Sequence, residues 1–196
     1  MKCYQCGNED KRYFAYDKGV YYCRKCVAFG RMDAYLRKGS CHLSTRVIEV
    51  SPQLKYELTD KQKAISRKIV GYLKQKKDVF VYAATGAGKT ESVFECICFY
   101  LSQGKKVGFA ISRRQVVLEI AQRLRQAFPT LHVVEVTQGY TTITDGDIIV
   151  CTMHQLYRYP DGFDLLIMDE VDAFPYVGMM CCRQLLEEPV KVKEFC

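Results

Sequence analysis

The sequence lacks any apolar run long enough to cross a membrane. A membrane-spanning helix needs roughly 20 consecutive apolar residues, and no stretch of the 196 residues approaches that length. The first residues, MKCYQCGNEDKRYF, lack the apolar core of a secretion signal. Internal repeats and low-complexity tracts are also absent. These absences argue against a membrane-embedded or secreted protein and predict a cytoplasmic one.

Nothing in the composition indicates wholesale disorder. Hydrophobic residues make up 48% of the chain, which is enough for a sizeable core. The chain also has 11 cysteines. In a secreted protein such a number would indicate disulfides, whereas in a cytoplasmic protein metal ligands and buried thiols are expected.

Negative charge is scarce in the N-terminal part. Residues 1–78 hold 18 Lys and Arg against 8 Asp and Glu, whereas residues 79–196 hold 11 against 14. The whole chain has a net charge of +7, and its excess positive charge therefore lies in the first part. Such asymmetry indicates an anionic partner there, most simply nucleic acid, with an ordinary solvated basic surface as the alternative.

Residues 58–178 predict an α/β domain with a parallel sheet covered by helices on both faces. Apolar runs typical of strands alternate with stretches of helical periodicity, as they do in parallel sheets. A further short strand is expected at Arg46–Val50. The expected strands are Val79–Ala83, Val107–Ile111, His132–Val136, Ile148–Cys151 and Phe163–Met168, and the expected helices are Leu58–Lys74 with Thr59 as N-cap, Lys89–Gln103, Arg114–Phe128 and His154–Tyr157.

The segment AATGAGKTE, Ala83 to Glu91, has the pattern of a phosphate-binding loop. A strand, a glycine turn and a helix that opens on Lys-Thr let backbone amides and the helix N-terminus face phosphate. Alanine replaces the usual first glycine, as in the helicase-type variant, and a chance turn is the alternative. Lys89 is expected to reach the β and γ phosphates and Thr90 to ligate Mg²⁺. The expected nucleotide-binding residues here are Thr85, Gly86, Ala87, Gly88, Lys89 and Thr90.

The segment FDLLIMDEVD places carboxylates at the end of a buried strand, where open parallel sheets bind ligands. We expect Asp169 to hold Mg²⁺ and the nucleotide, and Glu170 to orient the attacking water. Lys89, Asp169 and Glu170 are thus the candidate catalytic residues for phosphoryl transfer. The alternative is a strand that ends in a solvated acidic turn.

Two Cys-x-x-Cys pairs predict a zinc-binding module in residues 1–40, followed by a linker at 41–57. Two tight turns can present four thiolates to one tetrahedral Zn²⁺ ion, and a redox pair is the weaker alternative. Tyr13 and Phe14 are expected to pack around the metal, while the basic residues stay available to DNA. Cys41, Cys96, Cys98 and Cys151 are interpreted as small hydrophobic residues. The expected zinc ligands are Cys3, Cys6, Cys23 and Cys26.

Together these motifs resemble those of the superfamily-two helicases, with AATGAGKT as motif I and DEVD as motif II. LTDKQ is similar to the upstream Q motif, which implies that Gln62 reads the adenine edge. ISRRQ and VCTMHQL stand where motifs Ia and Ib lie in that superfamily. The alternative for Arg113 and Arg114 is a solvated helix start, and the alternative for His154 is a capped surface residue. The nucleic-acid contacts implied by the resemblance are Ser112, Arg113, Arg114, Thr152 and His154.

The four-cysteine module, the lobe and the segment MDEVDAFPYVG resemble the ComFA family of late competence ATPases over residues 1–178. The resemblance implies a RecA-like lobe that uses ATP, Mg²⁺ and structural Zn²⁺. It also implies a motor that moves single-stranded DNA at the inner face of the cell membrane. Its partners would be a competence-operon protein and the membrane DNA channel, with a homo-oligomer left open. The alternatives are a PriA-like replication-restart helicase fragment, a zinc-dependent DNA-binding module without ATPase activity, and a non-functional fragment.

Residues 179–196 depart from that family's pattern. Family members continue into motif III and a second RecA-like lobe, whereas this tail has Cys181, Cys182 and Cys196 and no Ser-Ala-Thr-like motif. One possible codon series for this tail, with a single adenine restored before it, translates in the shifted frame into a sequence that reads as a helicase continuation. We therefore expect a chain truncated to its zinc module and first motor lobe, with a tail that a one-base deletion has shifted out of frame.

Overall fold

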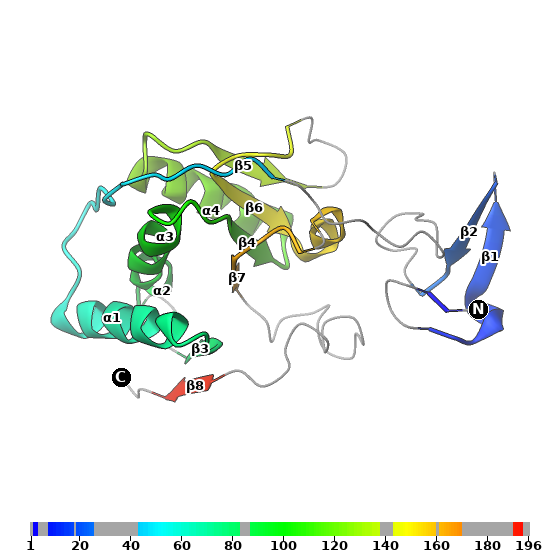
Figure 1. The fold of residues 1–196 in the computed structure, drawn as a ribbon, viewed down its shortest axis with the longest axis horizontal. Coiled ribbons are helices and arrows are strands. Elements are labelled where there is room, and N and C mark those ends of the chain that lie inside the picture. Colours follow the sequence, from blue (N-terminus) through cyan, green and yellow to red (C-terminus); the bar gives the residue numbers. More distant parts are fainter. Residues whose placement is uncertain are drawn as a thin grey trace.

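The computed structural model of the chain describes residues 2–3, 8–17, 19–25, 43–82, 87–137, 143–159, 161–169 and 190–193. Near the N-terminus, η1 (Lys11–Tyr13) leads into a hairpin of β1 (Phe14–Asp17) and β2 (Val20–Cys23), and an α/β domain follows (Figure 1). Within these ranges, no helix has both the length and the apolar content that a membrane span requires.

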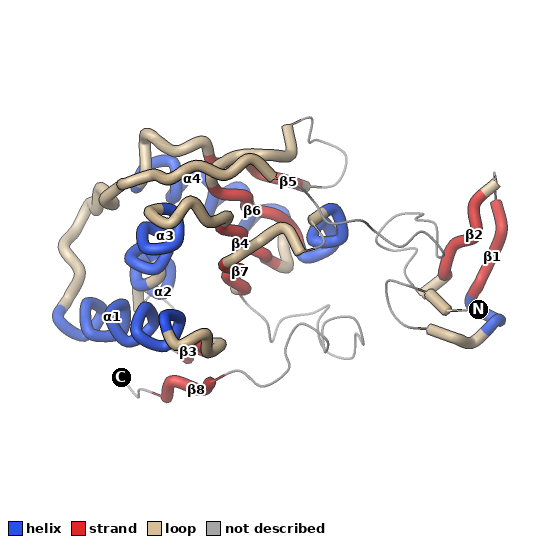
Figure 2. The backbone as a smooth tube through the Cα atoms, viewed as in Figure 1, coloured by secondary structure: helices blue, strands red, loops and turns tan. Residues whose placement is uncertain are grey.

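Four parallel strands form the central sheet, in the order β5-β6-β4-β7 (Figure 2). All four strands were expected, and β4 has the predicted bounds. The parallel order confirms the α/β class and fits a RecA-like domain. The bounds are β4 Val107–Ile111, β5 Val133–Val136, β6 Ile148–Thr152 and β7 Leu165–Met168.

The two faces of this sheet are covered differently. Strand side chains alternate between faces, so Ile148 and Val150 join the large core beneath α3 (Phe94–Leu101) and α4 (Arg114–Ala127). Ile149 and Cys151 point into a smaller cluster with Tyr159. In the part of the chain that the structure describes, this second face is covered by the 3-10 helix η3 (Met153–Arg158) rather than by the expected α-helical layer.

Helix α1 (Asp60–Lys74) begins where the sequence predicts. The Gln62 backbone N–H donates to the Thr59 hydroxyl at 3.3 Å, and the Thr59 N–H donates to Gln62 Oε1 at 2.9 Å. This reciprocal capping box satisfies two N–H groups that an uncapped helix would leave unpaired. The Thr59 N-cap is therefore confirmed.

The strand before the phosphate loop lies outside the central sheet. β3 (Val79–Tyr82) pairs in parallel with β8 (Val190–Lys193), with Val79 opposite Val190. Its residues are only half-buried, and Tyr82 is 69% exposed, unlike the fully buried β4 and β6. The expected single sheet is therefore divided in two among the described residues. The partner strand of β3 comes from the atypical tail.

Two local predictions are wrong. The helix expected at Lys89–Gln103 is divided into α2 (Lys89–Ser92) and α3, because Val93 leaves α2 in a tight turn and its N–H donates back to Thr90. The strand expected at Arg46–Val50 does not form. Instead of a ladder, the backbone there makes one bond to the domain, from Ile48 N–H to Leu101 O at 3.0 Å.

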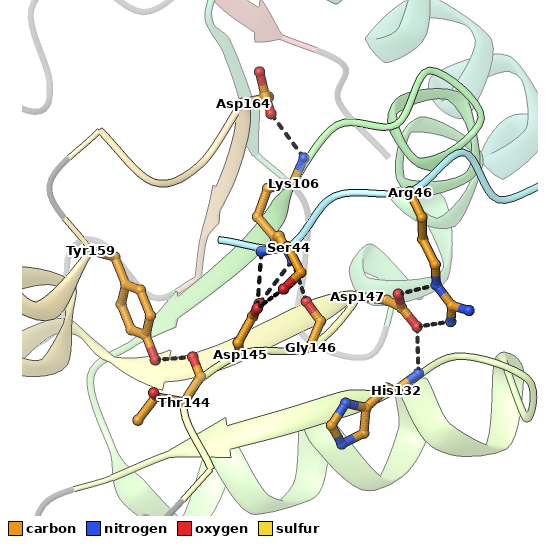
Figure 3. A network of polar contacts seen from close by, with 10 residues as sticks. All are labelled: Ser44, Arg46, Lys106, His132, Thr144, Asp145, Gly146, Asp147, Tyr159 and Asp164. Carbon is orange, nitrogen blue, oxygen red and sulfur yellow. Dashed lines mark hydrogen bonds and ion pairs between the residues drawn. The ribbon is translucent and has the colours of Figure 1, made fainter. Parts of the chain in front are cut away.

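Polar contacts fasten the linker to the loop before β6 (Figure 3). The Ser44 N–H and hydroxyl donate to Asp145 at 2.9 and 2.6 Å, and Arg46 pairs with Asp147 through two bonds of 2.8 and 2.7 Å. In addition, the buried Lys106 ammonium donates to Asp145 at 3.0 Å and to the Gly146 carbonyl at 2.6 Å. The linker is therefore a docked part of the domain.

Loss of Lys106 should loosen this docking. Burial alone would raise the pKa of Asp145, but hydrogen bonds from Ser44 and Lys106 outweigh it and lower the pKa from 3.8 to about 2. The docking thus contributes stability above pH ~4 and loses it as the pH falls towards 2. We expect Lys106→Met to lower the free energy of unfolding by about 2 kcal/mol, measured by urea unfolding at pH 7. Lys105→Met is the control, and an equal loss in both variants would contradict the prediction.

Candidate functional site

The end of the phosphate loop has the conformation that the sequence predicts. Gly88 has φ +76, in the left-handed region that favours glycine. It is the N-cap of α2, so Lys89 and Thr90 open a helix directly after the loop. The side chain of Lys89 is exposed and that of Thr90 is half-buried. Thr85 and Gly86 lie outside the described residues.

Gln62 lies against this loop. Its side-chain Nε2 donates to the Ala87 carbonyl at 2.9 Å, while its Oε1 accepts from the Thr59 N–H. Both ends of the amide are therefore engaged with protein groups. The Q-motif resemblance implied a contact with adenine, and the structure places Gln62 at the loop itself, where it fixes the backbone beside Gly88.

Arg123 approaches the loop from α4, and sequence reasoning missed it. Its guanidinium donates to the Thr90 hydroxyl at 3.5 Å and pairs with Glu91 at 3.3 Å. A cation here can hold the Thr90 hydroxyl and α2 in place. No sequence signal distinguished Arg123, because an arginine on the exposed face of an amphipathic helix is ordinary.

Asp169 follows β7 at the edge where the parallel strands end. Its backbone N–H donates to the Ala110 carbonyl at 3.1 Å, which ties it to the end of β4. Its side chain is half-buried. Glu170 lies outside the described residues. Since β7 and β3 belong to different sheets, the structure does not join Asp169 and the phosphate loop through a shared sheet.

The candidate nucleic-acid residues gather at this same edge. Ile111 is opposite Thr152 in the β4–β6 register, and Ala110 is opposite Met168 in the β4–β7 register. Ser112, which follows β4, and Thr152, which ends β6, therefore lie at the same sheet edge as Asp169. Arg113 and Arg114 are exposed at the start of α4, where cations can follow a phosphate backbone. His154 stands in η3, and its side chain lies outside what the structure describes.

Two of the four expected zinc ligands are described, and both are buried. Cys3 and Cys23 are each 1% exposed, and the Cys3 N–H donates to the Asn8 carbonyl at 2.8 Å. Cys6 and Cys26 lie outside the described residues, which contain no group of three or more His, Cys, Asp or Glu side chains able to hold a metal. Tyr13, expected to pack around the metal, is 39% exposed, and its packing against a metal stays a prediction.

Three cysteines of the α/β domain have thiols whose pKa is raised by burial. Burial raises the pKa of Cys96 and of Cys151 to about 12 and that of Cys98 to about 11. A thiol with such a pKa stays protonated at neutral pH, and only the thiolate is a strong nucleophile or metal ligand. These three residues therefore pack as small hydrophobic side chains, as predicted. Cys41 lies outside the described residues.

Comparison with known proteins agrees with the motifs. Residues 55–185 match the family described as type III restriction enzyme, res subunit. The chain is 35% identical over 185 residues to the competence protein ComFA of Bacillus subtilis (strain 168), covering 89% of this chain and 39% of that protein. It is 32% identical over 203 residues to ComFA of Streptococcus pneumoniae (strain ATCC BAA-255 / R6), covering 96% of this chain and 44% of that protein.

The resemblance to the ComFA family that the motifs predicted is thus confirmed. The chain spans about two fifths of the length of these curated relatives, at 39% and 44%.

Proposed function

Because the chain belongs to the family described as type III restriction enzyme, res subunit, we propose that it is the front part of an ATP-driven motor that moves along single-stranded DNA. The observation that carries the proposal is Gly88, whose left-handed backbone opens α2 on Lys89 and Thr90. A glycine turn that leads into a Lys-Thr helix start is the arrangement with which P-loops bind phosphate. The two similar proteins are named competence proteins, which supports a role for this motor in competence, and we propose that this role is DNA uptake.

In this proposal the residues act mainly by positioning charge. Lys89 binds the β and γ phosphates, and Glu170 orients the attacking water. The oxygen donors of Thr90 and Asp169 suit Mg²⁺, a hard cation that prefers oxygen ligands. Once bound, the ion neutralises charge that develops on the phosphates. Gln62 and Arg123 hold the loop and Thr90 in place from two sides.

Nucleic acid would cross the edge where β4, β6 and β7 end. Ser112, Arg113, Arg114, Thr152 and His154 are the proposed contacts, chiefly to phosphates. Partners of the whole motor would be a competence-operon protein and the membrane DNA channel. We place it in the cytoplasm at the inner face of the membrane. A second lobe or a neighbouring copy would supply the arginine that completes the ATP site, which can be worth roughly 10³–10⁵ in rate.

For the N-terminal module we propose one structural Zn²⁺ ion held by Cys3, Cys6, Cys23 and Cys26. Two observations support it. Cys3 is buried and its N–H bonds to the Asn8 carbonyl, and Cys23 ends β2 with its side chain fully buried. Four thiolates suit zinc because a soft donor set favours it over Mg²⁺ or Ca²⁺.

Nucleotide binding by the Lys89→Ala variant tests the proposed ATP site. A hydrogen bond to a charged group is worth about 1.5–3 kcal/mol, so the variant should bind a fluorescent ATP analogue roughly tenfold more weakly or worse. ATP turnover with and without single-stranded DNA is measured beside it. Lys105→Ala is the control, because Lys105 precedes the start of β4, whereas Asp169 is bonded near the other end of that strand. Unchanged binding in Lys89→Ala would refute the ATP site, and DNA binding that persists alone would favour a DNA-binding module without ATPase activity.

A further inference from the structure

Exposed aromatic rings gather on the N-terminal hairpin. Tyr13, Tyr16 and Tyr21 are 39%, 62% and 43% exposed, and they make up three of the eight exposed large hydrophobic side chains among the described residues. The other five are spread over the linker and the domain. The apolar faces of large rings are stabilised when they leave water, so their concentration on one short hairpin marks a surface suited to binding a ligand.

The hairpin holds two of these rings as a pair. Tyr16 lies directly opposite Tyr21 in the β1–β2 register, and their ring centroids are 4.7 Å apart with the planes tilted by 48°. The turn beside them contains Gly19 at φ +83, a conformation that glycine adopts without strain. Strand pairing therefore fixes the rings in advance, and a ligand that stacks on them need not order them.

Cations surround the base of the hairpin. Lys11, Arg12, Arg24 and Lys25 are all exposed. Arg12 pairs with Asp10 at 2.7 Å, and the Lys25 ammonium lies 4.3 Å from the centre of the Tyr13 ring. None of the described carboxylates forms an ion pair with Lys11 or Arg24. The neighbouring Asp17 points to the other face of the hairpin from Tyr16, because successive strand residues alternate.

We propose that Tyr16 and Tyr21 form a base-stacking platform for single-stranded nucleic acid, with Lys11, Arg24 and Lys25 following its phosphates. Exposed rings accept the faces of unpaired bases, whereas a duplex keeps those faces stacked inside it. Rings beside cations are the combination that binds single strands without sequence preference. This inference rests on the DNA-binding part of the proposed function and is independent of the ATP site.

A single introduced tryptophan tests the platform directly, because the chain has no tryptophan of its own. Tyr16→Trp is titrated with a thymidine oligomer of about 15 nucleotides, long enough for one binding module, and indole emission is followed. Stacking should quench that emission strongly. Tyr56→Trp is the matched control, since Tyr56 is 75% exposed in the linker, and its emission should stay unchanged. Unquenched emission from Tyr16→Trp while the oligomer is bound would overturn the platform.

Affinity gives a second readout. The double variant Tyr16→Ser/Tyr21→Ser should bind a fluorescein-labelled oligomer roughly tenfold more weakly or worse by anisotropy, and Tyr16→Phe/Tyr21→Phe should bind like the wild type. The dependence of affinity on salt should stay the same, because the phosphate contacts remain. Equal affinity, or a loss that appears only as a changed salt dependence, would contradict stacking.

The two proposals fail in different ways. If the wild-type chain binds no oligomer, both the platform and the DNA-binding part of the proposed function are refuted, while the Lys89→Ala result still decides the ATP site. If the wild type binds the oligomer but both tyrosine readouts are silent, the platform alone is refuted.

Discussion

Replacing Gly88 by alanine is expected to weaken nucleotide binding strongly. An L-residue in the left-handed region costs roughly 1–2 kcal/mol, and Gly88 has φ +76. The added Cβ would also overlap Gln62 Nε2, the atom that donates to the Ala87 carbonyl. Relief of this clash moves either Gln62 or the loop, so the backbone amides no longer face the phosphates. Binding of a fluorescent ATP analogue should weaken by roughly tenfold or more, since 1.4 kcal/mol is a factor of ten.

Gly71→Ala is the matched control for this experiment. Gly71 lies inside α1 with open space around the position of a Cβ. Alanine there should raise the free energy of unfolding by roughly 0.5–1 kcal/mol and leave nucleotide binding unchanged. Gly88→Ala with wild-type nucleotide affinity would show that this loop does not bind phosphate.

Loss of zinc is expected to unfold the N-terminal module. In small zinc modules, structural Zn²⁺ contributes an apparent free energy of about 10–16 kcal/mol to folding. A hairpin of two four-residue strands such as β1–β2 has little core without the metal. Cys23→Ser should therefore lose the metal and the hairpin together. The measurements are zinc content, with one ion per chain expected in the wild type, and protease resistance of the N-terminal residues.

Cys98→Ser is the control for the zinc experiment. Cys98 is half-buried in α3 and its thiol has a raised pKa, so it should hold no metal. Zinc content should stay at the wild-type level in this variant. A wild-type chain without zinc, or a Cys23→Ser variant that keeps it, would exclude the four-cysteine site.

The sequence by itself determined the elements whose signals are local. The start of α1 follows from the Thr59–Gln62 capping box, which is complete within four residues. The strand β4 follows from an uninterrupted apolar run with the length of a buried strand. The Gly88 turn follows from a conformation that few residues other than glycine adopt. Each of these depends on backbone energetics over a few neighbouring residues, so no tertiary information was needed.

Only the tertiary structure decided which distant residues meet. Arg123 reaches Thr90 across 33 positions, and Ser44 meets Asp145 across 101. The segment 46–50 has the composition of a strand, but contacts with Asp147 and Leu101 hold it as a docked linker instead. Pairing of β3 with β8 likewise depends on which edge is available. Long-range contacts are set by how all elements pack together, and no local pattern encodes that choice.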